Sequence, residues 1–471
     1  MTRAKLSEDS LAILFGAGIL LIAVLAWLML PYGDAAADLA NARGAPGFSS
    51  EIWQPQSDTA SGLTTLLSHS VVSLSRWQLN PLTAFSAASI GAFAGLSCVL
   101  AVLYGLFARH FGTTTGAFIK GFLLLSLIAL GANLLGNQSE FRSYGFGYAL
   151  WAIAIGLIIS NGFGLPAIFK PALQHELYVK TGLVLLGAEV LFSKILAIGL
   201  PGIFVAWVTT PIVLISTFWF GQNVLKIKSK TLNITVSADM SVCGVSAAIA
   251  TGAACGAKKE ELTTAIGLSM MFTAIMMVAL PAFIRAIGMP EVLGGAWIGG
   301  TIDATGAVVA AGAFLGDTAL NVAATIKMIQ NILIGVIAFA VAVYWSTRVD
   351  NASGRTVTAA EIWLRFPKFV LGFIGASLLF SSLHASLAPA LSRVLLEDGV
   401  LNYTGEIRDW LFCLAFASIG LSTNFKDLRT QFSGGKPLLL YVCGQSLNLC
   451  LTLLVAWLMF YKVFPEVTNA L

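Results

Sequence analysis

Two stretches rich in glycine and other small residues hold the residue types that could do chemistry in this chain. Residues 299–316 contain five glycines, two threonines and one carboxylate, Asp303, and residues 241–256 place serine, threonine and cysteine among glycines and alanines. Both stretches lie between long apolar runs, and a pair of glycine-interrupted segments in an apolar chain indicates the binding site of a transporter. Close packing of helices would favour the same small residues, but packing alone does not require Asp303.

The chemistry that these residues predict is the binding of a small anion by helix ends. Where a helix is broken at membrane depth, the N-terminus of its second half offers unpaired N–H groups and the positive end of the helix dipole. Gly244 and Gly306 allow close approach of the backbone, and hydroxyl groups can add hydrogen-bond donors. The candidate substrate-binding residues are Ser241, Cys243, Gly244, Ser246, Thr301, Thr305 and Gly306.

Three charged residues are candidates for coupling transport to a proton or to Na⁺. Asp303 is the first of them, because burial favours the protonated form of a carboxylate. Lys327 could neutralise the charge of a substrate or form a structural ion pair with Asp303, and the two interpretations are compatible. Glu189 is a lesser candidate, since packing against a polar partner would also explain it. The sequence shows no metal-ligand spacing and no nucleophile motif, so we expect no enzyme, no metal and no cofactor.

The composition of the chain places these residues in a membrane. Of 471 residues, 57% are hydrophobic and only 11% are charged, whereas ordinary soluble domains have about 25% charged residues. The sequence therefore predicts an all-α polytopic membrane protein with the lipid bilayer as its surroundings. The net charge of +4 gives no indication of a nucleic-acid partner.

Apolar runs along the chain predict about thirteen transmembrane segments. The two small-residue stretches count among them as discontinuous helices. The predicted segments are residues 11–30, 83–108, 118–135, 144–160, 178–192, 202–220, 240–255, 262–284, 296–315, 320–344, 366–387, 407–421 and 437–460. We expect residues 1–112 to form an N-terminal extension of two spans with a polar outer loop, and residues 113–471 to form the transporter core.

The distribution of lysine and arginine predicts the orientation of the chain in the plasma membrane. If all thirteen segments cross, the loops on the side of the N-terminus carry more of these residues than the loops on the opposite side. The positive-inside rule then places the N-terminus in the cytoplasm and the C-terminus outside. If a discontinuous segment enters and leaves the membrane on the same side, the predicted side of the loops next to it changes.

An internal echo in the sequence predicts an inverted repeat. Residues 183–192 resemble residues 414–425, because in each a glycine precedes a phenylalanine by five residues and a proline-led long helix follows. The two segments are the fifth and twelfth of the predicted spans, so they point in opposite directions, as inverted-topology repeats do. Chance matching of short apolar helices is the alternative interpretation.

Several motifs resemble those of a known family. They are Ser241-Val-Cys-Gly-Val-Ser-Ala247, the charged turn at residues 258–261, Gly300-Thr-Ile-Asp-Ala-Thr-Gly-Ala-Val-Val-Ala-Ala-Gly312, and Ile326-Lys-Met328. Together they look like the motifs of a bacterial inner-membrane family that carries the provisional name sulfate exporter, and the resemblance extends from Phe118 to the C-terminus. It implies a cell inner membrane protein within a superfamily of cation–proton antiporters and anion transporters. Members of that superfamily are built from inverted repeats with discontinuous helices and are often homodimers.

The sequence departs from this family pattern at four positions. Asp303 stands where relatives usually have histidine, and Ala307 stands where they often have glutamine. Gln330 and Glu189 stand where arginine is common. The site therefore has fewer cationic groups than the resemblance implies, which bears on the charge of the substrate.

Three hypotheses for the function follow from these observations. The first is a secondary active transporter that exports a small anion of sulfate, sulfite or sulfonate type, coupled to protons or Na⁺. The second is a cation–proton antiporter in which Asp303 binds the cation. The third is a membrane enzyme or an ion-pump subunit, against which the absence of clustered His, Cys or acidic ligands in the sequence argues.

Overall fold

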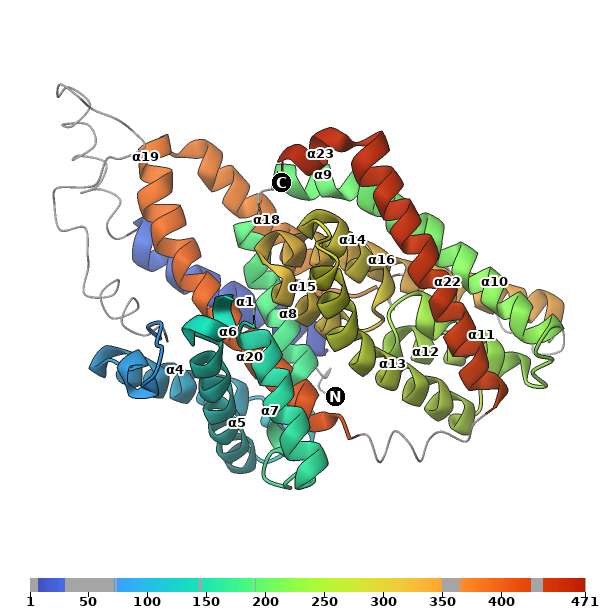
Figure 1. The fold of residues 1–471 in the computed structure, drawn as a ribbon, viewed down its shortest axis with the longest axis horizontal. Helices are drawn as coiled ribbons and strands as arrows, with labels where there is room; N and C mark the ends of the chain where they lie inside the picture. Colours follow the sequence, from blue (N-terminus) through green and yellow to red (C-terminus); the bar gives the residue numbers. More distant parts are fainter. Residues whose placement is uncertain are drawn as a thin grey trace, which may run out of the picture. The chain divides into compact units, whose positions relative to one another are not determined.

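A computed structural model shows a nearly all-helical chain (Figure 1). The structure describes residues 7–29, 72, 74–143, 146–190, 192–349, 363, 366–424 and 435–470. Helices overlap every segment predicted from the apolar runs. Within the described residues, the β-structure is one isolated bridge between Trp77 and Gln138. The predicted polar outer loop between the first two spans lies largely outside the described residues.

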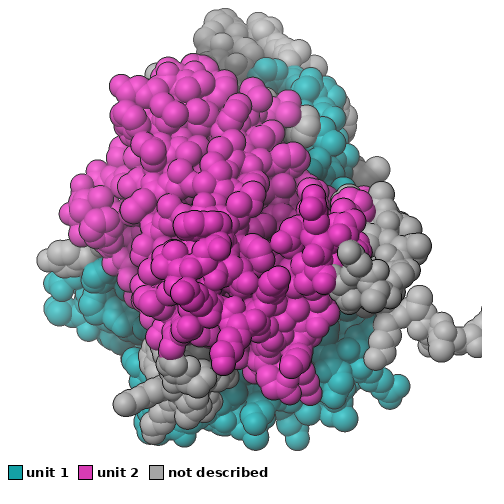
Figure 2. Space-filling view, turned by 90° about the vertical axis from the view of Figure 1, so that its right-hand side faces the viewer, with its two compact units in different colours: residues 1–192, 368–422 teal, residues 193–367, 423–471 magenta. Residues whose placement is uncertain are grey.

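The chain divides into two compact units, which Figure 2 shows in teal and magenta. Unit 1 comprises residues 1–192 and 368–422, and unit 2 comprises residues 193–367 and 423–471. Each unit is therefore assembled from two separate parts of the chain. The division into an extension (residues 1–112) and a transporter core (residues 113–471) stays a prediction.

Eight helices among the described residues are long and apolar enough to cross a membrane. Unit 1 contains Glu8–Leu28, Ala87–Gly105, Thr115–Gly136 and Phe369–Ser386, and unit 2 contains Ile195–Asn223, Lys259–Ala286, Asp317–Val349 and Lys436–Val463. A helix needs about 20 apolar residues to span the hydrocarbon core, and the remaining predicted segments correspond to shorter or more polar helices. The prediction of a helical membrane protein is confirmed.

Unit 1 is organised around α8 (His175–Glu189), whose residues from Leu177 to Ala188 are almost all buried. Three helices pack directly on α8: α1 (Glu8–Val24), α18 (Phe369–Ser386) and α20 (Asn402–Ser422). The other elements of unit 1 are η1 (Leu25–Met29), η2 (Pro81–Ala84), α4 (Ala87–Gly105), η3 (Ala108–Phe111), α5 (Thr115–Gly136), α6 (Ser139–Ser143), α7 (Tyr148–Gly162), η4 (Lys170–Ala172), α19 (Pro389–Leu391) and η7 (Ser392–Leu401).

Glycines bring the backbones of unit 1 into close contact. A Cβ atom added at Gly187 would collide with the carbonyl oxygen of Phe373 on α18, and one added at Gly420 would lie 2.5 Å from the carbonyl oxygen of Ile153 on α7. Gly156 faces Gly420 across the same contact, where an added Cβ would lie 2.8 Å from the Gly420 Cα. Gly187 and Gly420 are the two glycines of the internal echo, and close helix packing accounts for both.

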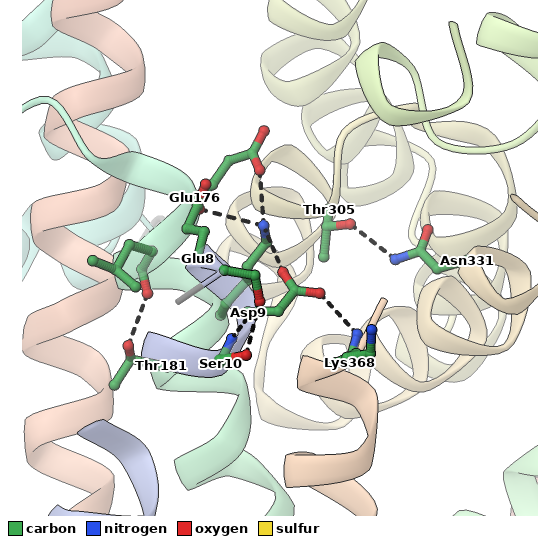
Figure 3. Close-up of polar contacts among 11 residues, drawn as sticks. Glu8, Asp9, Ser10, Glu176, Thr181, Thr305, Asn331 and Lys368 are labelled. Carbon is green, nitrogen blue, oxygen red and sulfur yellow. Dashed lines mark hydrogen bonds and ion pairs between the residues drawn. The ribbon is translucent and has the colours of Figure 1, made fainter. Parts of the chain in front are cut away.

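A cluster of charged side chains fastens the first helix to the rest of unit 1 (Figure 3). Three carboxylates lie within 3.3 Å of Lys180 Nζ, those of Glu8, Asp9 and Glu176. The Asp9 carboxylate also accepts a 2.8 Å hydrogen bond from the backbone N–H of Lys368, where α18 begins. The acidic residues lie in the first turns of α1 and α8, where the helix dipole stabilises negative charge. The cluster therefore joins the N-terminal ends of three helices.

Unit 2 is organised around two pairs of short helices. The first pair is α11 (Lys230–Ser241) and α12 (Val245–Cys255), and the second is α14 (Glu291–Thr301) and α15 (Thr305–Leu315). The longer elements around them are α9 (Phe192–Ile203), η5 (Phe204–Val208), α10 (Thr209–Asn223), α13 (Lys259–Ala286), α16 (Asp317–Tyr344), η6 (Trp345–Val349), α22 (Lys436–Leu458), η8 (Met459–Val463) and α23 (Pro465–Ala470).

The first pair folds back on itself as a helical hairpin, which we call the first hairpin. Thr235 Oγ1 of α11 lies 3.8 Å from Cys255 Sγ at the end of α12. Thr231, in the first turn of α11, donates a 2.8 Å hydrogen bond to Glu261, which follows α12. The two ends of the pair are therefore adjacent, and the tip is the break at residues 242–244.

The second pair, called the second hairpin, folds back in the same way. A Cβ atom added at Gly316, where α15 ends, would lie 2.7 Å from the carboxylate of Glu291, where α14 begins. Both halves pack along the first part of α16, since Gly295 of α14 approaches Ala319 and Gly312 of α15 approaches Leu320. The tip of this hairpin is the break at residues 302–304.

The two hairpins enter unit 2 from opposite ends, as α13 shows (Figure 1). Glu261, at the start of α13, contacts the base of the first hairpin. Ser269 lies at the tips, where it approaches both Gly244 and Asp303. Ile284, near the end of α13, contacts Gly294 at the base of the second hairpin. Following α13 from one end to the other therefore leads from one base, past both tips, to the other base.

This arrangement differs from the expected crossing of thirteen segments. A half-helix of 11 residues is roughly 16 Å long, about half the thickness of the hydrocarbon core. Two such halves could cross a membrane only if they continued in the same direction. They reverse instead, so the two predicted discontinuous spans are re-entrant in form, and the count of thirteen crossings is not confirmed.

Sided labelling of introduced cysteines tests the hairpin geometry. We expect Ile287→Cys and Asp317→Cys, which flank the second hairpin, to react with a membrane-impermeant thiol reagent from the same side of the membrane. Lys259→Cys, beyond the first hairpin, should react from the opposite side. The background variant replaces the exposed Cys98 and Cys450 with serine. Labelling of positions 287 and 317 from opposite sides would show that the second pair crosses.

A matched pair of glycine variants tests the packing of unit 1. We expect Gly420→Ala to lower the free energy of unfolding by about 1–3 kcal/mol, because the added methyl group meets a backbone carbonyl. Gly131→Ala is the control, since an added Cβ there meets nothing within 4 Å and helix propensity favours alanine. Denaturant unfolding in detergent measures both, and equal effects would contradict the contact.

Candidate functional site

The candidate site is the place where the tips of the two hairpins meet inside unit 2. Gly244 has a positive φ of 62°, a conformation that favours glycine. A Cβ atom added there would lie 2.8 Å from Ser269 Oγ and 3.3 Å from the Cβ of Asp303. The left-handed conformation lets the first hairpin reverse, and the missing side chain lets its tip touch the second hairpin. Gly244 and Asp303, both predicted from the sequence, are thus brought together.

Asp303 is buried at this contact, with 2% of its surface exposed. Its Oδ2 atom accepts a hydrogen bond from the hydroxyl of Tyr441 on α22 and lies 3.5 Å from Ser269 Oγ. Its Oδ1 atom has no hydrogen-bond partner among the described residues. The carboxylate therefore has two neutral donors and one open oxygen, so it can take up a proton or contact a cation.

The first half of each hairpin ends in carbonyl groups that lack helical partners, and side chains from neighbouring helices supply the donors. Lys327 Nζ donates a 2.6 Å hydrogen bond to the carbonyl of Val242. Gln330 Nε2 donates to the carbonyls of Ser241 at 3.1 Å and of Gly300 at 3.3 Å, so one side chain bridges both hairpins. Unpaired carbonyls at membrane depth are costly, which explains why these donors are needed.

Lys327 is buried and makes its direct contacts with neutral groups. Besides the Val242 carbonyl, its Nζ atom donates a 2.7 Å hydrogen bond to Gln330 Oε1. In the described part of the chain, Lys327 and Asp303 interact electrostatically without a direct ion pair, and the role of Lys327 as the partner of Asp303 stays a prediction. Its ammonium group remains the positive charge of the candidate site.

The second half of each hairpin begins with N–H groups directed toward the tips. Neither α12 nor α15 has a side-chain cap at its N-terminus, where Gly244 and Ala304 occupy the N-cap positions. Thr305, in the first turn of α15, accepts a 3.1 Å hydrogen bond from Asn331 Nδ2 (Figure 3). The two helix N-termini, each with its positive dipole end, can therefore bind an anion.

The remaining predicted residues divide into buried and open positions. Ser241, Cys243 and Thr301 are buried beside the tips. Gly306 is half-buried in the first turn of α15, whereas Ser246 is exposed on α12. The structure therefore places Ser246 outside the buried cluster.

Glu189 belongs to unit 1, not to the hairpins. It is the last residue of α8 and forms an ion pair with Arg408 of α20. Arg408 also contacts its neighbour Asp409 at 2.8 Å, and Asp409 accepts a hydrogen bond of 3.3 Å from Tyr148. Packing against a polar partner, the alternative given for Glu189, matches this network, and its role in ion coupling stays a prediction.

Several residues of the site were not singled out from the sequence. Tyr441, Ser269 and Gln445 lie on long helices whose apolar patterns hide them, and Asp239 lies two residues before the first small-residue stretch. A signal for the pair of hairpins was nevertheless present. Residues 241–256 align without a gap with residues 301–316, so that Gly252 and Gly256 fall on Gly312 and Gly316.

Comparisons with known proteins identify relatives that match most of the chain. The family model described as Conserved hypothetical protein 698 matches residues 120–441. A UPF0324 membrane protein of Nitratidesulfovibrio vulgaris is 61% identical over 79% of this chain, and the chain spans only 65% of that relative's length. A UPF0324 membrane protein of Rhodopirellula baltica is 57% identical, covering 83% of this chain and 72% of the relative.

A more distant relative carries a location in its name. The UPF0324 inner membrane protein YeiH of Escherichia coli K12 is 27% identical over 69% of this chain and 89% of the relative. No solved structure matches the chain. The comparisons therefore support a membrane protein and leave its substrate to be argued from the site.

Two alanine variants separate backbone strain from crowding at the hairpin tip. We expect Gly244→Ala to lower the free energy of unfolding by roughly 2–4 kcal/mol, since it combines an unfavourable positive φ with a clash against Ser269. Gly256→Ala, at a φ of 69° with nothing within 4 Å, should cost only about 1–2 kcal/mol. Thermal unfolding in detergent measures the difference, and equal losses would argue against close contact of the tips.

Proposed function

The chain belongs to the UPF0324 family of conserved bacterial membrane proteins, and we propose that it acts as a secondary active transporter. The observation that carries the proposal is the meeting of two opposed helical hairpins around the buried Asp303. Broken backbone at membrane depth is tolerated only where protein buries it or where it lines a watery cavity. A carboxylate at such a break marks an ion or substrate path.

We further propose that the two hairpins belong to an inverted repeat. Each hairpin has a three-residue break and is followed by a 28-residue helix, α13 or α16. The hairpins enter from opposite ends, so the two helices run in opposite directions. This supports an inverted repeat at residues 230–286 and 291–344, a different pair of segments from the echo between residues 183–192 and 414–425.

The hairpin geometry also bears on the proposed orientation. The end of unit 2 at the base of the first hairpin carries Lys226, Lys228, Lys230, Lys258, Lys259, Arg348 and Lys436. The end at the base of the second hairpin carries Arg285 and Lys462 among its described residues. The positive-inside rule therefore favours a cytoplasmic first end, which leaves the C-terminus outside. We also propose a cytoplasmic N-terminus and a homodimer.

The proposed substrate is a small anion of sulfate, sulfite or sulfonate type that is exported. The uncapped N-termini of α12 and α15 would supply N–H donors, and Lys327 would supply positive charge. Asp303 would carry the coupling ion, a proton or Na⁺, because either one neutralises a carboxylate that would otherwise repel an anion beside it. Export driven by an ion gradient follows from this coupling, and no catalytic step is required.

Cation–proton antiport is the second candidate, and one observation favours it. A further carboxylate, Asp239, is fully buried close to Asp303. When ionised, the two carboxylates outnumber the one ammonium group, and the resulting net negative charge favours the binding of a cation over an anion at the tips. An enzyme or ion-pump subunit has no comparable support from the site.

Transport in proteoliposomes distinguishes these candidates. We expect purified protein to move sulfate, sulfite or a small sulfonate when a pH gradient or a Na⁺ gradient is imposed, and we expect Asp303→Asn to reduce the coupled rate by roughly tenfold or more. Asparagine keeps the size of the side chain but cannot exchange a proton. Asp317→Asn is the control, since Asp317 is an exposed acid in the first turn of α16.

The outcome also decides whether the transported ion is an anion or a cation. A pH response that depends on Na⁺ or K⁺ and not on the anion would replace anion export with antiport. Activity that survives Asp303→Asn unchanged would contradict both assignments of Asp303.

A further inference from the structure

Asp239 is a buried carboxylate for which the proposed mechanism has no use. It lies on α11 with 0% of its surface exposed, and within the described residues neither of its carboxylate oxygens accepts a hydrogen bond of normal geometry. Its backbone carbonyl accepts a 2.8 Å hydrogen bond from the N–H of Gly244, which holds it next to the tip of the first hairpin. A buried carboxylate without donors is costly unless a cation or a proton accompanies it.

The neighbours of Asp239 come from the opposite hairpin and from α13. Asp239 is close enough to Asp303 for the two carboxylates to interact electrostatically, and Ser269 lies beside both. Asp303 Oδ1 and the hydroxyl of Thr301 are also buried without a hydrogen-bond partner in the described part of the chain. Asp239 on the first hairpin and Asp303 on the second therefore both carry buried, unpartnered oxygens close to Ser269.

The charges around this place do not balance. From α16, Lys327 contributes one ammonium group, which already donates to Val242 and to Gln330. From α22, Tyr441 contributes a neutral hydroxyl that is bound to Asp303. From the first hairpin, the buried free cysteine Cys243 interacts electrostatically with Lys327. Two carboxylates and one ammonium leave one negative charge, which a single monovalent cation would neutralise and a divalent cation would over-compensate.

We propose that Asp239 and Asp303 together bind one Na⁺ ion at the meeting point of the two hairpins. This inference rests on the proposed function, for which it names the coupling ion. The open oxygens are two from Asp239, one from Asp303 and the hydroxyl of Thr301, and oxygen atoms are the ligands that hard cations prefer. A proton bridges at most two oxygens, whereas Na⁺ takes several oxygen ligands at once. In secondary transporters, unwound backbone and the C-terminal ends of broken helices also coordinate Na⁺.

Thermal stability of the purified full chain in detergent tests the site. A ligand that binds only the folded state raises the melting temperature with its concentration, so Na⁺ should raise it and K⁺ at the same ionic strength should not. Asp239→Asn and Asp303→Asn should each weaken the apparent Na⁺ affinity by roughly tenfold or more. Asp317→Asn is the matched control and should leave the Na⁺ response unchanged.

Several results would overturn the proposal. Equal responses to Na⁺ and K⁺ would show that no selective site exists, and a Na⁺ response that survives Asp239→Asn would remove Asp239 from it. If Asp239→Asn does not fold, Thr301→Val provides the same test, because it removes one ligand oxygen without removing a charge. A Thr301→Val variant with full Na⁺ affinity would then contradict the site.

The experiment also separates this proposal from the proposed function. Binding is measured in detergent, without a membrane gradient, so a selective Na⁺ response in a protein that transports nothing would sustain the site and contradict the transporter. Transport that proceeds in the absence of Na⁺, by a protein whose melting temperature does not respond to Na⁺, would sustain the transporter and contradict the Na⁺ site.

Discussion

The structure of unit 2 depends on one constraint, the need to satisfy backbone polar groups at two helix breaks away from water. Each break leaves carbonyls at the end of one half-helix and N–H groups at the start of the next. Lys327 and Gln330 donate to the carbonyls at the tips, and Gln445 donates a 3.0 Å hydrogen bond to the carbonyl of Thr301. The long helices α16 and α22 therefore carry polar residues at mid-length, where an ordinary membrane helix would be apolar.

The same constraint accounts for the chemistry of the tips. Neutral amides cap most of the carbonyls, so the positive charge of Lys327 is only partly used, and the N-termini of α12 and α15 stay uncapped by side chains. Gln330 bridges the carbonyls of both hairpins without adding charge. The tips thus combine anion-binding backbone with two buried carboxylates, Asp239 and Asp303, and this combination suits a site whose charge changes when an ion enters or leaves.

Unit 1 follows a different principle, because its helices are joined mainly by close packing. Gly187 and Gly420 lie against neighbouring backbones, and α8 is buried on nearly all sides. Two of its basic side chains form ion pairs, Lys180 with three carboxylates and Arg408 with Glu189. The two glycines whose spacing predicted a repeat therefore also have a local packing role. Small residues in membrane helices can result from close contact between helices as well as from a common origin of two segments.

The sequence alone determined the class of the protein and the centre of its site. Hydrophobic composition requires membrane helices, and a carboxylate among glycines between apolar runs requires a buried break, so Asp303 and Gly244 could be found from residue types. The direction of the chain after each break could not, because a half-helix of 11 residues has the same composition whether it continues or reverses. Contacts with α13 and α16 decided the reversal. Only the tertiary structure also brought Tyr441, Ser269 and Asp239 to Asp303, since those contacts join residues that are distant in sequence.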